Sequence, residues 1–314
     1  MNNSKEYKTG LWVDSKAQFI NRSTNGQGWS YRIQKDKSEY PKYYNGGEII
    51  ITAKKWQTAQ QALNLIYAGM TLVDSYNTNI FSSSRPLATE NAVSSQAKTN
   101  KIPTEFHCYT PSIPRACEIA VKASRSLKYT YALTKYFYSC ELFSTPSIEL
   151  DPFHSPNLKI SSFREDHVRF ATSILVAYSA IEELNLHIKA SNENPSRLEN
   201  GKWNPDVRND LENRLKENKI NIQEPLLWSI RGPRRSLDKK SRLQAIQPAE
   251  YSKGQVKDID VDICDAISES SWLRSKISAH GFSKLASSLS PYDVSNVQHI
   301  VRRILLEIFG YWRN

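Results

Sequence analysis

The stretch "REDHVRFATSILVAYSAIEELNLHIKA" at residues 164–190 carries the clearest periodic pattern of the chain. Apolar side chains recur every three or four residues through it, at Phe170, Ile174, Ala177, Ile181 and Leu184. That spacing places them on one face of a helix that packs against a core. Acidic residues near its start suit the positive end of the helix dipole. The stretch therefore predicts a long amphipathic helix.

Helical patterns continue to the end of the chain. The segment "NPDVRNDLENRLKENKI" starts with Pro205, and proline suits the first turn of a helix. In "DIDVDICDAISESSWLRSKISAHG", Ile259, Ile263 and Ile267 share one helical face, and Gly281 marks the end. The closing "PYDVSNVQHIVRRILLEIFGYW" is again amphipathic. Four helices with short to moderate connections predict an all-α bundle over residues 160–314.

The first 150 residues have a mixed pattern. "STNGQGWSYRI" and "NGGEIIITA" each combine turn residues with a strand. Helical spacing then starts near Thr52, which is placed as an N-cap, and again at Ser112, where one helix is expected over residues 112–142. We therefore expect an α+β protein, with an N-terminal mixed α/β region at residues 1–150 that senses a trigger or binds RNA or a partner.

Aromatic residues are dense in the first fifty positions. They are either the core of a small sheet or a surface on which bases stack, and we favour the core. They include Trp12, Phe19, Trp29, Tyr31, Tyr40, Tyr43 and Tyr44.

Composition narrows the functional classes. The 314 residues carry a net charge of +10, which favours a polyanionic partner such as RNA. The N-terminus lacks a signal-peptide pattern, no apolar run is long enough to span a membrane, and the four cysteines have no CxxC spacing. We expect a cytoplasmic protein without membrane contact. Glycine-rich phosphate loops and HExxH and GxSxG motifs are absent from the sequence, so no metal or cofactor is expected.

The stretch "SWLRSKISAHGFS" at residues 271–283 holds the strongest functional signal. It places Arg274 six positions before His280, which Gly281 follows. Arginine offers a permanently charged fork of donors to phosphate oxygens, and histidine exchanges protons near neutral pH. RNA cleavage by attack of a ribose 2′-OH needs both functions and no metal. The plain alternative is a solvated helix face with a glycine C-cap.

This region resembles the HEPN superfamily, whose signature is an Arg followed after four to six residues by a His. "FATSILVAYSAIEELNLHI" resembles the earlier HEPN helix, with Glu182 or Glu183 as its acidic residue. "NPDVRNDLENRLKE" followed by "LLWSIRGPRR" is similar to the segment between those helices. Active members often have Asn, Asp or His after the Arg, whereas this chain has Ser275.

The resemblance implies a homodimeric, metal-independent endoribonuclease with Arg274 and His280 as catalytic residues and Ser275 and one of the two glutamates in support. Such enzymes serve antiviral defence, abortive infection and toxin–antitoxin systems, so an antitoxin or an activating ligand is an expected partner. Ser275 favours the alternative, a non-catalytic HEPN-like module that dimerises and binds RNA or protein.

The spacing of Arg274 and His280 along a helix is one reason to expect a homodimer. Positions six apart on an ideal α-helix are rotated by about 120°, so Arg274 and His280 of one chain do not point at one spot. Either the helix ends between them or a symmetric second chain completes the site, and we favour the dimer.

A basic segment, "RGPRRSLDKKSR", precedes this region. It either holds the RNA backbone or is a solvated loop, and both interpretations stay open. Its residues, together with a lysine near His280, give the candidate RNA contacts Arg231, Arg234, Arg235, Lys239, Lys240 and Lys276.

Overall fold

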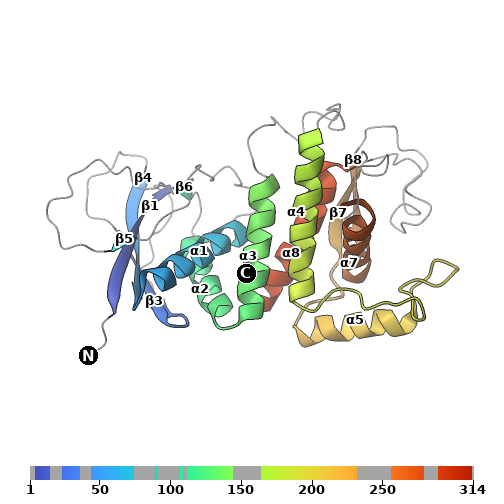
Figure 1. Ribbon diagram of the computed structural model, residues 1–314, viewed down its shortest axis with the longest axis horizontal. Helices are drawn as coiled ribbons and strands as arrows, with labels where there is room; N and C mark the ends of the chain where they lie inside the picture. Colours follow the sequence, from blue (N-terminus) through green and yellow to red (C-terminus); the bar gives the residue numbers. More distant parts are fainter. Residues whose placement is uncertain are drawn as a thin grey trace. The chain divides into compact units, whose positions relative to one another are not determined.

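The chain has a mixed α+β fold, as the sequence predicts (Figure 1). The computed structural model describes residues 4–14, 23–35, 44–73, 89–90, 107–108, 112–143, 164–231, 256–278 and 289–312. Its contacts divide into an N-terminal unit, Met1–Phe137, and a C-terminal unit, Tyr138–Asn314. The functional division at residues 150–160 stays a prediction.

The N-terminal unit is built on an antiparallel sheet in the order β2-β3-β4-β1-β5, with β6 also paired to β1. Its two long strands pair along their whole length, from Lys5 opposite Ala53 to Asp14 opposite Tyr44. β-Branched residues suit this pleated surface, and the run Ile49–Ile51 is fully buried. The strands are β1 (Lys5–Asp14), β2 (Ser23–Asn25), β3 (Trp29–Lys35), β4 (Tyr44–Ala53), β5 (Thr89–Glu90) and β6 (His107–Cys108).

Aromatic residues of this sheet belong to the core wherever their side chains are described. Tyr7, Trp29 and Tyr31 are buried, and the rings of Trp29 and Tyr31 lie 6.3 Å apart between centroids. These side chains have no face open to a base, so the core interpretation is confirmed for Trp29 and Tyr31. The other five side chains lie outside the described residues.

Three helices follow the sheet: α1 (Trp56–Val73), α2 (Ser112–Ser124) and α3 (Leu127–Phe143). The prediction of Thr52 as an N-cap is wrong, because β4 extends through it and α1 begins only at Trp56. The single helix expected from Ser112 is in fact two. The hydroxyl of Ser124 donates to the Val121 carbonyl, and that of Thr130 donates to the Ala123 carbonyl, so these side chains bind the backbone where the helix breaks.

Helices α1 and α2 cross at Gly69. A β-carbon at this position would lie 2.6 Å from the carbonyl oxygen of Ala116. Gly69→Ala in a helix interior would normally stabilise the protein by about 1 kcal/mol. Here we expect it to lower the free energy of unfolding by about 1–3 kcal/mol, because backbone must move. Urea denaturation measures the sign.

The exposed Gln61→Ala change on the same helix serves as the control, with an expected effect within about 0.5 kcal/mol. A Gly69→Ala variant as stable as wild type would show that the crossing is loose.

The C-terminal unit joins helices to a two-stranded sheet. α4 packs against α8 and the π-helical segment η4, while α7 and α8 both contact β7 (Figure 1). The elements are α4 (Arg164–Glu183), α5 (Pro205–Glu217), β7 (Leu226–Arg231), β8 (Val256–Val261), α7 (Ile263–Trp272), η4 (Leu273–Ser278) and α8 (Pro291–Phe309). α4 ends earlier than predicted, since Asn185 adopts a left-handed conformation with φ of 59°.

The expectation of an all-α C-terminal half is wrong at β7 and β8. Along β7, buried Leu226 and Trp228 flank Leu227, which is exposed, so burial follows the period of two of a strand. Trp228 pairs with Ile259 of β8, whereas the sequence pattern had placed Ile259 on a helix with Ile263 and Ile267. The helix starts later because Asp262 accepts from the backbone N–H of Asp265 at 2.9 Å and so caps α7.

Helix α8 confirms the predicted closing helix and its start at Pro291. It begins at Pro291, where the N–H of Ser290 donates to Asp293 at 2.8 Å, and it ends at left-handed Gly310. No helix within the described ranges is long and apolar enough to cross a membrane.

Candidate functional site

An ion pair joins α4 and η4, the two helical segments that carry the predicted site residues Glu182 and Arg274. Nη2 of Arg274 on η4 lies 3.2 Å from Oε1 of Glu182 on α4. Both side chains keep a substantial exposed fraction, 42% and 34%, so the pair is open to solvent and contributes little to stability. The pair leaves part of the Arg274 guanidinium side chain accessible to solvent. Of the two glutamates proposed, Glu182 is thus the one placed beside Arg274.

Tyr178 and Ser271 lie behind this ion pair. Tyr178 is one helical turn before Glu182, and its hydroxyl is hydrogen-bonded to Ser271, which precedes Arg274 by three residues. Burial raises the pKa of the Tyr178 hydroxyl, and the Glu182 carboxylate adds to this shift. The Ser271 hydrogen bond and the Arg274 charge oppose it. Tyr178 is therefore a protonated, buried hydroxyl at neutral pH, next to the Arg274 charge.

The segment that carries Arg274 is not an ideal α-helix. Trp272 ends α7, and residues 273–278 form the π-helical η4, in which each N–H bonds five residues back. The widened turn invalidates the rotation of about 120° between Arg274 and His280, because that value assumes 3.6 residues per turn. Ser275 is on the same segment, and its hydroxyl donates a hydrogen bond of 3.4 Å to the Trp272 carbonyl.

His187 is a titratable neighbour that the sequence analysis did not single out. It follows the left-handed turn that ends α4, and its carbonyl accepts from Nη1 of Arg214 at 3.0 Å. Burial, and then the Arg214 charge, lower the pKa of His187, and the Arg274 charge acts in the same direction. The imidazole is therefore neutral at pH 7. Its Nδ1 is buried and has no hydrogen-bond partner among the described residues.

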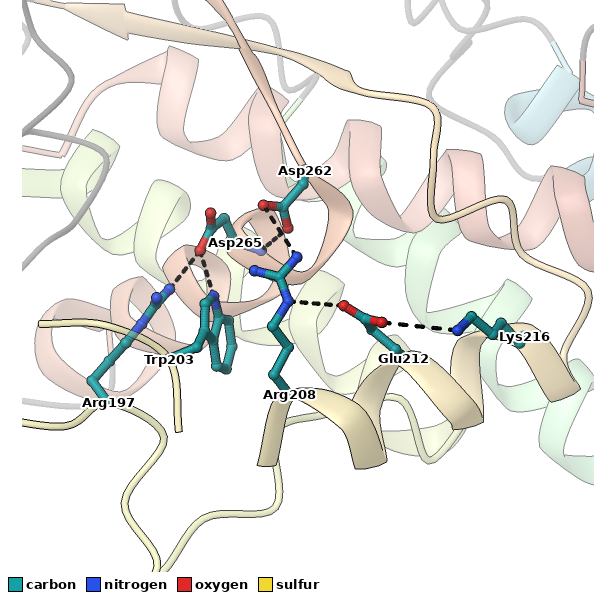
Figure 2. A network of polar contacts seen from close by, with 7 residues as sticks. All are labelled: Arg197, Trp203, Arg208, Glu212, Lys216, Asp262 and Asp265. Carbon is teal, nitrogen blue, oxygen red and sulfur yellow. Dashed lines mark hydrogen bonds and ion pairs between the residues drawn. The ribbon is translucent and has the colours of Figure 1, made fainter. Parts of the chain in front are cut away.

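A second network anchors the start of α7, which leads directly into η4 (Figure 2). Oδ1 of Asp265 accepts from Nη2 of Arg197 at 2.5 Å and from Nε1 of Trp203 at 2.8 Å. The Arg197 guanidinium also lies over the Trp203 ring, 3.9 Å from its centroid. These contacts fix the loop between α4 and α5 to α7. The network therefore holds α7 in place, and α7 leads directly into η4, which carries Arg274.

Helix α5 extends this network. Nη2 of Arg208 lies 3.8 Å from the capping carboxylate of Asp262, and its Nε donates to Glu212 at 2.8 Å (Figure 2). Lys216 is 3.9 Å from the other oxygen of Glu212. Cys264, near the start of α7, is buried, and desolvation raises the pKa of its thiol to about 12. Cys264 is therefore an unreactive thiol, and the network is a structural support rather than a nucleophilic site.

The two carboxyl groups of this network titrate in opposite directions. Burial opposes ionisation of Asp265, but hydrogen bonds from Asp262, Arg197 and Trp203 outweigh it and lower the Asp265 pKa. Burial, first, and a hydrogen bond to Asp265 raise the pKa of Asp262. Ionised Asp265 therefore stabilises the fold above its unfolded pKa of about 3.9, and this contribution is lost as the pH falls through the lowered folded value.

Asp265→Asn is expected to lower the free energy of unfolding at pH 7 by about 1.5–3 kcal/mol, because it removes a charge that two donors bind. The gap to wild type should begin to narrow below about pH 4, where Asp265 of the unfolded chain becomes protonated, and it should close further as the pH falls through the lowered pKa of folded Asp265. Denaturant unfolding at pH 7 and pH 3 measures both effects. Asp260→Asn, on the exposed side of β8, is the matched control. A gap that does not change with pH would contradict the role given to the charge.

Several predicted site residues lie outside the described residues. They are His280, Gly281 and four of the basic candidates, Arg234, Arg235, Lys239 and Lys240. Arg231 is the last residue of β7 and pairs with Val256, and Lys276 lies on η4. The side chains of Arg231 and Lys276 lie outside the described part of the structure. Their predicted roles stay predictions.

No group of three or more metal-ligating side chains comes together within the described part of the chain. Comparison with protein-family models, curated proteins and solved structures found no match to this chain.

Proposed function

We propose that this protein is an endoribonuclease of the HEPN type, in which a helical bundle carries Arg274 and His280 and needs no metal. The observation that supports it most is the ion pair between Arg274 and Glu182. The Arg of the motif and the acidic residue of the earlier helix are distant in sequence but adjacent in space.

The proposed chemistry divides among these side chains. Arg274, always charged, binds the non-bridging oxygens of the scissile phosphate and stabilises the charge that develops on them. His280 accepts the proton of the attacking 2′-OH as a base or donates a proton to the leaving 5′-oxygen as an acid. Glu182 positions the guanidinium, and the buried Tyr178 hydroxyl supports that arrangement through Ser271.

Homodimerisation belongs to the proposal as well. Two copies of the motif facing one cleft would supply both an acid and a base from the same residue type. Antiviral defence or toxin-like growth arrest, with an antitoxin or an activating ligand, is the proposed setting.

The rival function is a non-catalytic module that dimerises and binds RNA or protein. Two observations favour it: Glu182 pairs with the charge of Arg274, and the Ser275 hydroxyl donates to the Trp272 carbonyl of its own helix. In this case RNA binds but is not cut.

Incubation of the purified protein with RNA in EDTA separates the two functions. The enzyme should cut ordinary RNA and leave 5′-hydroxyl ends and 2′,3′-cyclic phosphates, because the 2′-oxygen attacks the phosphorus. RNA of the same sequence with 2′-O-methyl groups should stay intact. Intact ordinary RNA would support the binding module, and cleavage of both substrates would exclude attack by the 2′-OH.

A further inference from the structure

The corner where α2 meets α3 is strongly basic. Residues 122–135 contain four basic side chains and no Asp or Glu, and the nearest acidic residues are Glu118 and Glu141. The basic residues are Lys122, Arg125, Lys128 and Lys135. Lys122 and Arg125 are exposed, while Lys128 and Lys135 are half-buried. All lie in the N-terminal unit, and none belongs to the candidate site around Arg274.

Large apolar side chains are exposed on the same corner. Leu127, the first residue of α3, is 76% exposed, and Tyr131, in the second turn of the same helix, is 54% exposed. At about 100° per residue, positions 127, 128, 131 and 135 fall within one arc of about 100° on α3. Lysines and exposed apolar side chains therefore alternate along a single helix face. Large apolar side chains that are exposed together and rimmed by polar residues are a feature of interaction sites.

The corner is also held in one shape. Thr130 and Ser124 bond the carbonyls that end α2, at 3.0 Å and 2.9 Å. The backbone N–H of Gln27, from the turn between β2 and β3, donates to the Ser124 hydroxyl at 3.2 Å. The corner is thus fixed to the sheet before any ligand arrives, which lowers the entropic cost of binding.

The chemistry of this face fits a single nucleic-acid strand better than a protein. Protein interfaces are enriched in tyrosine but depleted in lysine, whereas this face interleaves the two. Strand-binding surfaces combine aromatic rings, on which bases stack, with cations that follow the phosphates.

We propose that the α2–α3 corner binds single-stranded RNA, with a base stacked on Tyr131 and phosphates at Arg125 and Lys128. The choice of RNA as the strand rests on the proposed function, while the surface itself lies outside the cleavage site.

Binding of a fluorescein-labelled 12-nucleotide oligouridine with 2′-O-methyl groups tests the proposal, measured by anisotropy on the full chain. Tyr131→Ala should weaken binding about 5-fold to 150-fold, the range for losing one stacked base, while Tyr131→Phe keeps the ring and the affinity. Arg125→Ala/Lys128→Ala should reduce the slope of log K against log salt by about 1.4, because two phosphate contacts are lost.

The control Lys202→Ala/Lys216→Ala removes the same charge from exposed positions of the C-terminal unit and should keep the slope. Unfolding midpoints close to wild type would show that the variants are folded. Unchanged binding in the Tyr131→Ala and double corner variants would overturn the proposal, as would an equal loss in the control. This RNA lacks a free 2′-OH, so the result stands even if ordinary RNA is not cleaved and the proposed function fails.

Discussion

Arg274→Ala is expected to slow RNA cleavage about 10²-fold to 10³-fold, the usual cost of losing one preorganised donor to a developing negative charge. Arg274→Lys should recover only part of the rate, because an ammonium keeps the charge but not the two-pronged geometry. Cleavage rates on a short RNA, with protein in excess, measure the effect on the chemical step.

Thermal unfolding separates this role from a structural one. The Arg274–Glu182 pair is exposed, so Arg274→Ala should leave the unfolding midpoint nearly unchanged. Glu182→Gln should reduce the cleavage rate less, since it loosens the guanidinium without removing it. Glu199→Gln, at an exposed loop position, is the matched charge control. An Arg274→Ala protein that unfolds many degrees lower would instead give the pair a structural role.

Arg303→Met is expected to lower the free energy of unfolding by about 3–5 kcal/mol, the cost of breaking a buried ion pair from one side. Arg303 on α8 is fully buried, and its Nε donates to Glu307 at 2.8 Å. Its Nη1 donates to the Glu224 carbonyl at 2.8 Å, and its Nη2 donates to the Asn221 carbonyl. Methionine fills similar space but leaves these carbonyls without their donor, and the buried Glu307 carboxylate keeps the Asn221 N–H as a donor but loses its cationic partner.

The double variant Arg303→Met/Glu307→Leu is the control for this prediction. It removes the stranded carboxylate as well, so it should regain part of the lost stability, while the unpaired carbonyls remain. Urea denaturation of the two variants gives the comparison. A loss below about 1 kcal/mol in the single variant would show that solvent or rearrangement satisfies Glu307.

Helix ends were predictable where the sequence carries a terminal signal. Pro205 and Pro291 start α5 and α8, and Gly310 ends α8, as proline and glycine favour. α4 was located by its apolar spacing, but its end depends on Asn185 in a left-handed turn, and asparagine signals this less strongly than glycine.

The elements that sequence reasoning missed had competing signals. "VKDIDV" alternates polar and apolar residues as a strand does, yet Ile259 also continues a helical row into α7. Pairing with β7 decides in favour of the strand, and pairing is a tertiary effect. The π-helical turn at Arg274 was not predicted, and the rotation per residue of an ideal α-helix does not apply to residues 273–278.

The candidate site was predicted in part. The motif and the earlier helix supplied Arg274 and Glu182, whose ion pair the structure describes. Tyr178 and Ser271 each precede one of these residues by a single turn, a spacing that a search of the same helix faces would have found. His187 lies after a turn that Arg214 fixes from another helix, so no local pattern predicts its place.

The cleavage rate of His280→Ala in EDTA, compared with wild type, tests the central claim most directly. His154→Ala is the matched control, a histidine that is not among the proposed site residues. We predict that His280→Ala cuts ordinary RNA about 10²-fold to 10⁴-fold more slowly, the usual contribution of a general acid or base, while His154→Ala cuts at the wild-type rate. Cleavage by His280→Ala at the wild-type rate would contradict the assignment of this residue and of the HEPN-type mechanism.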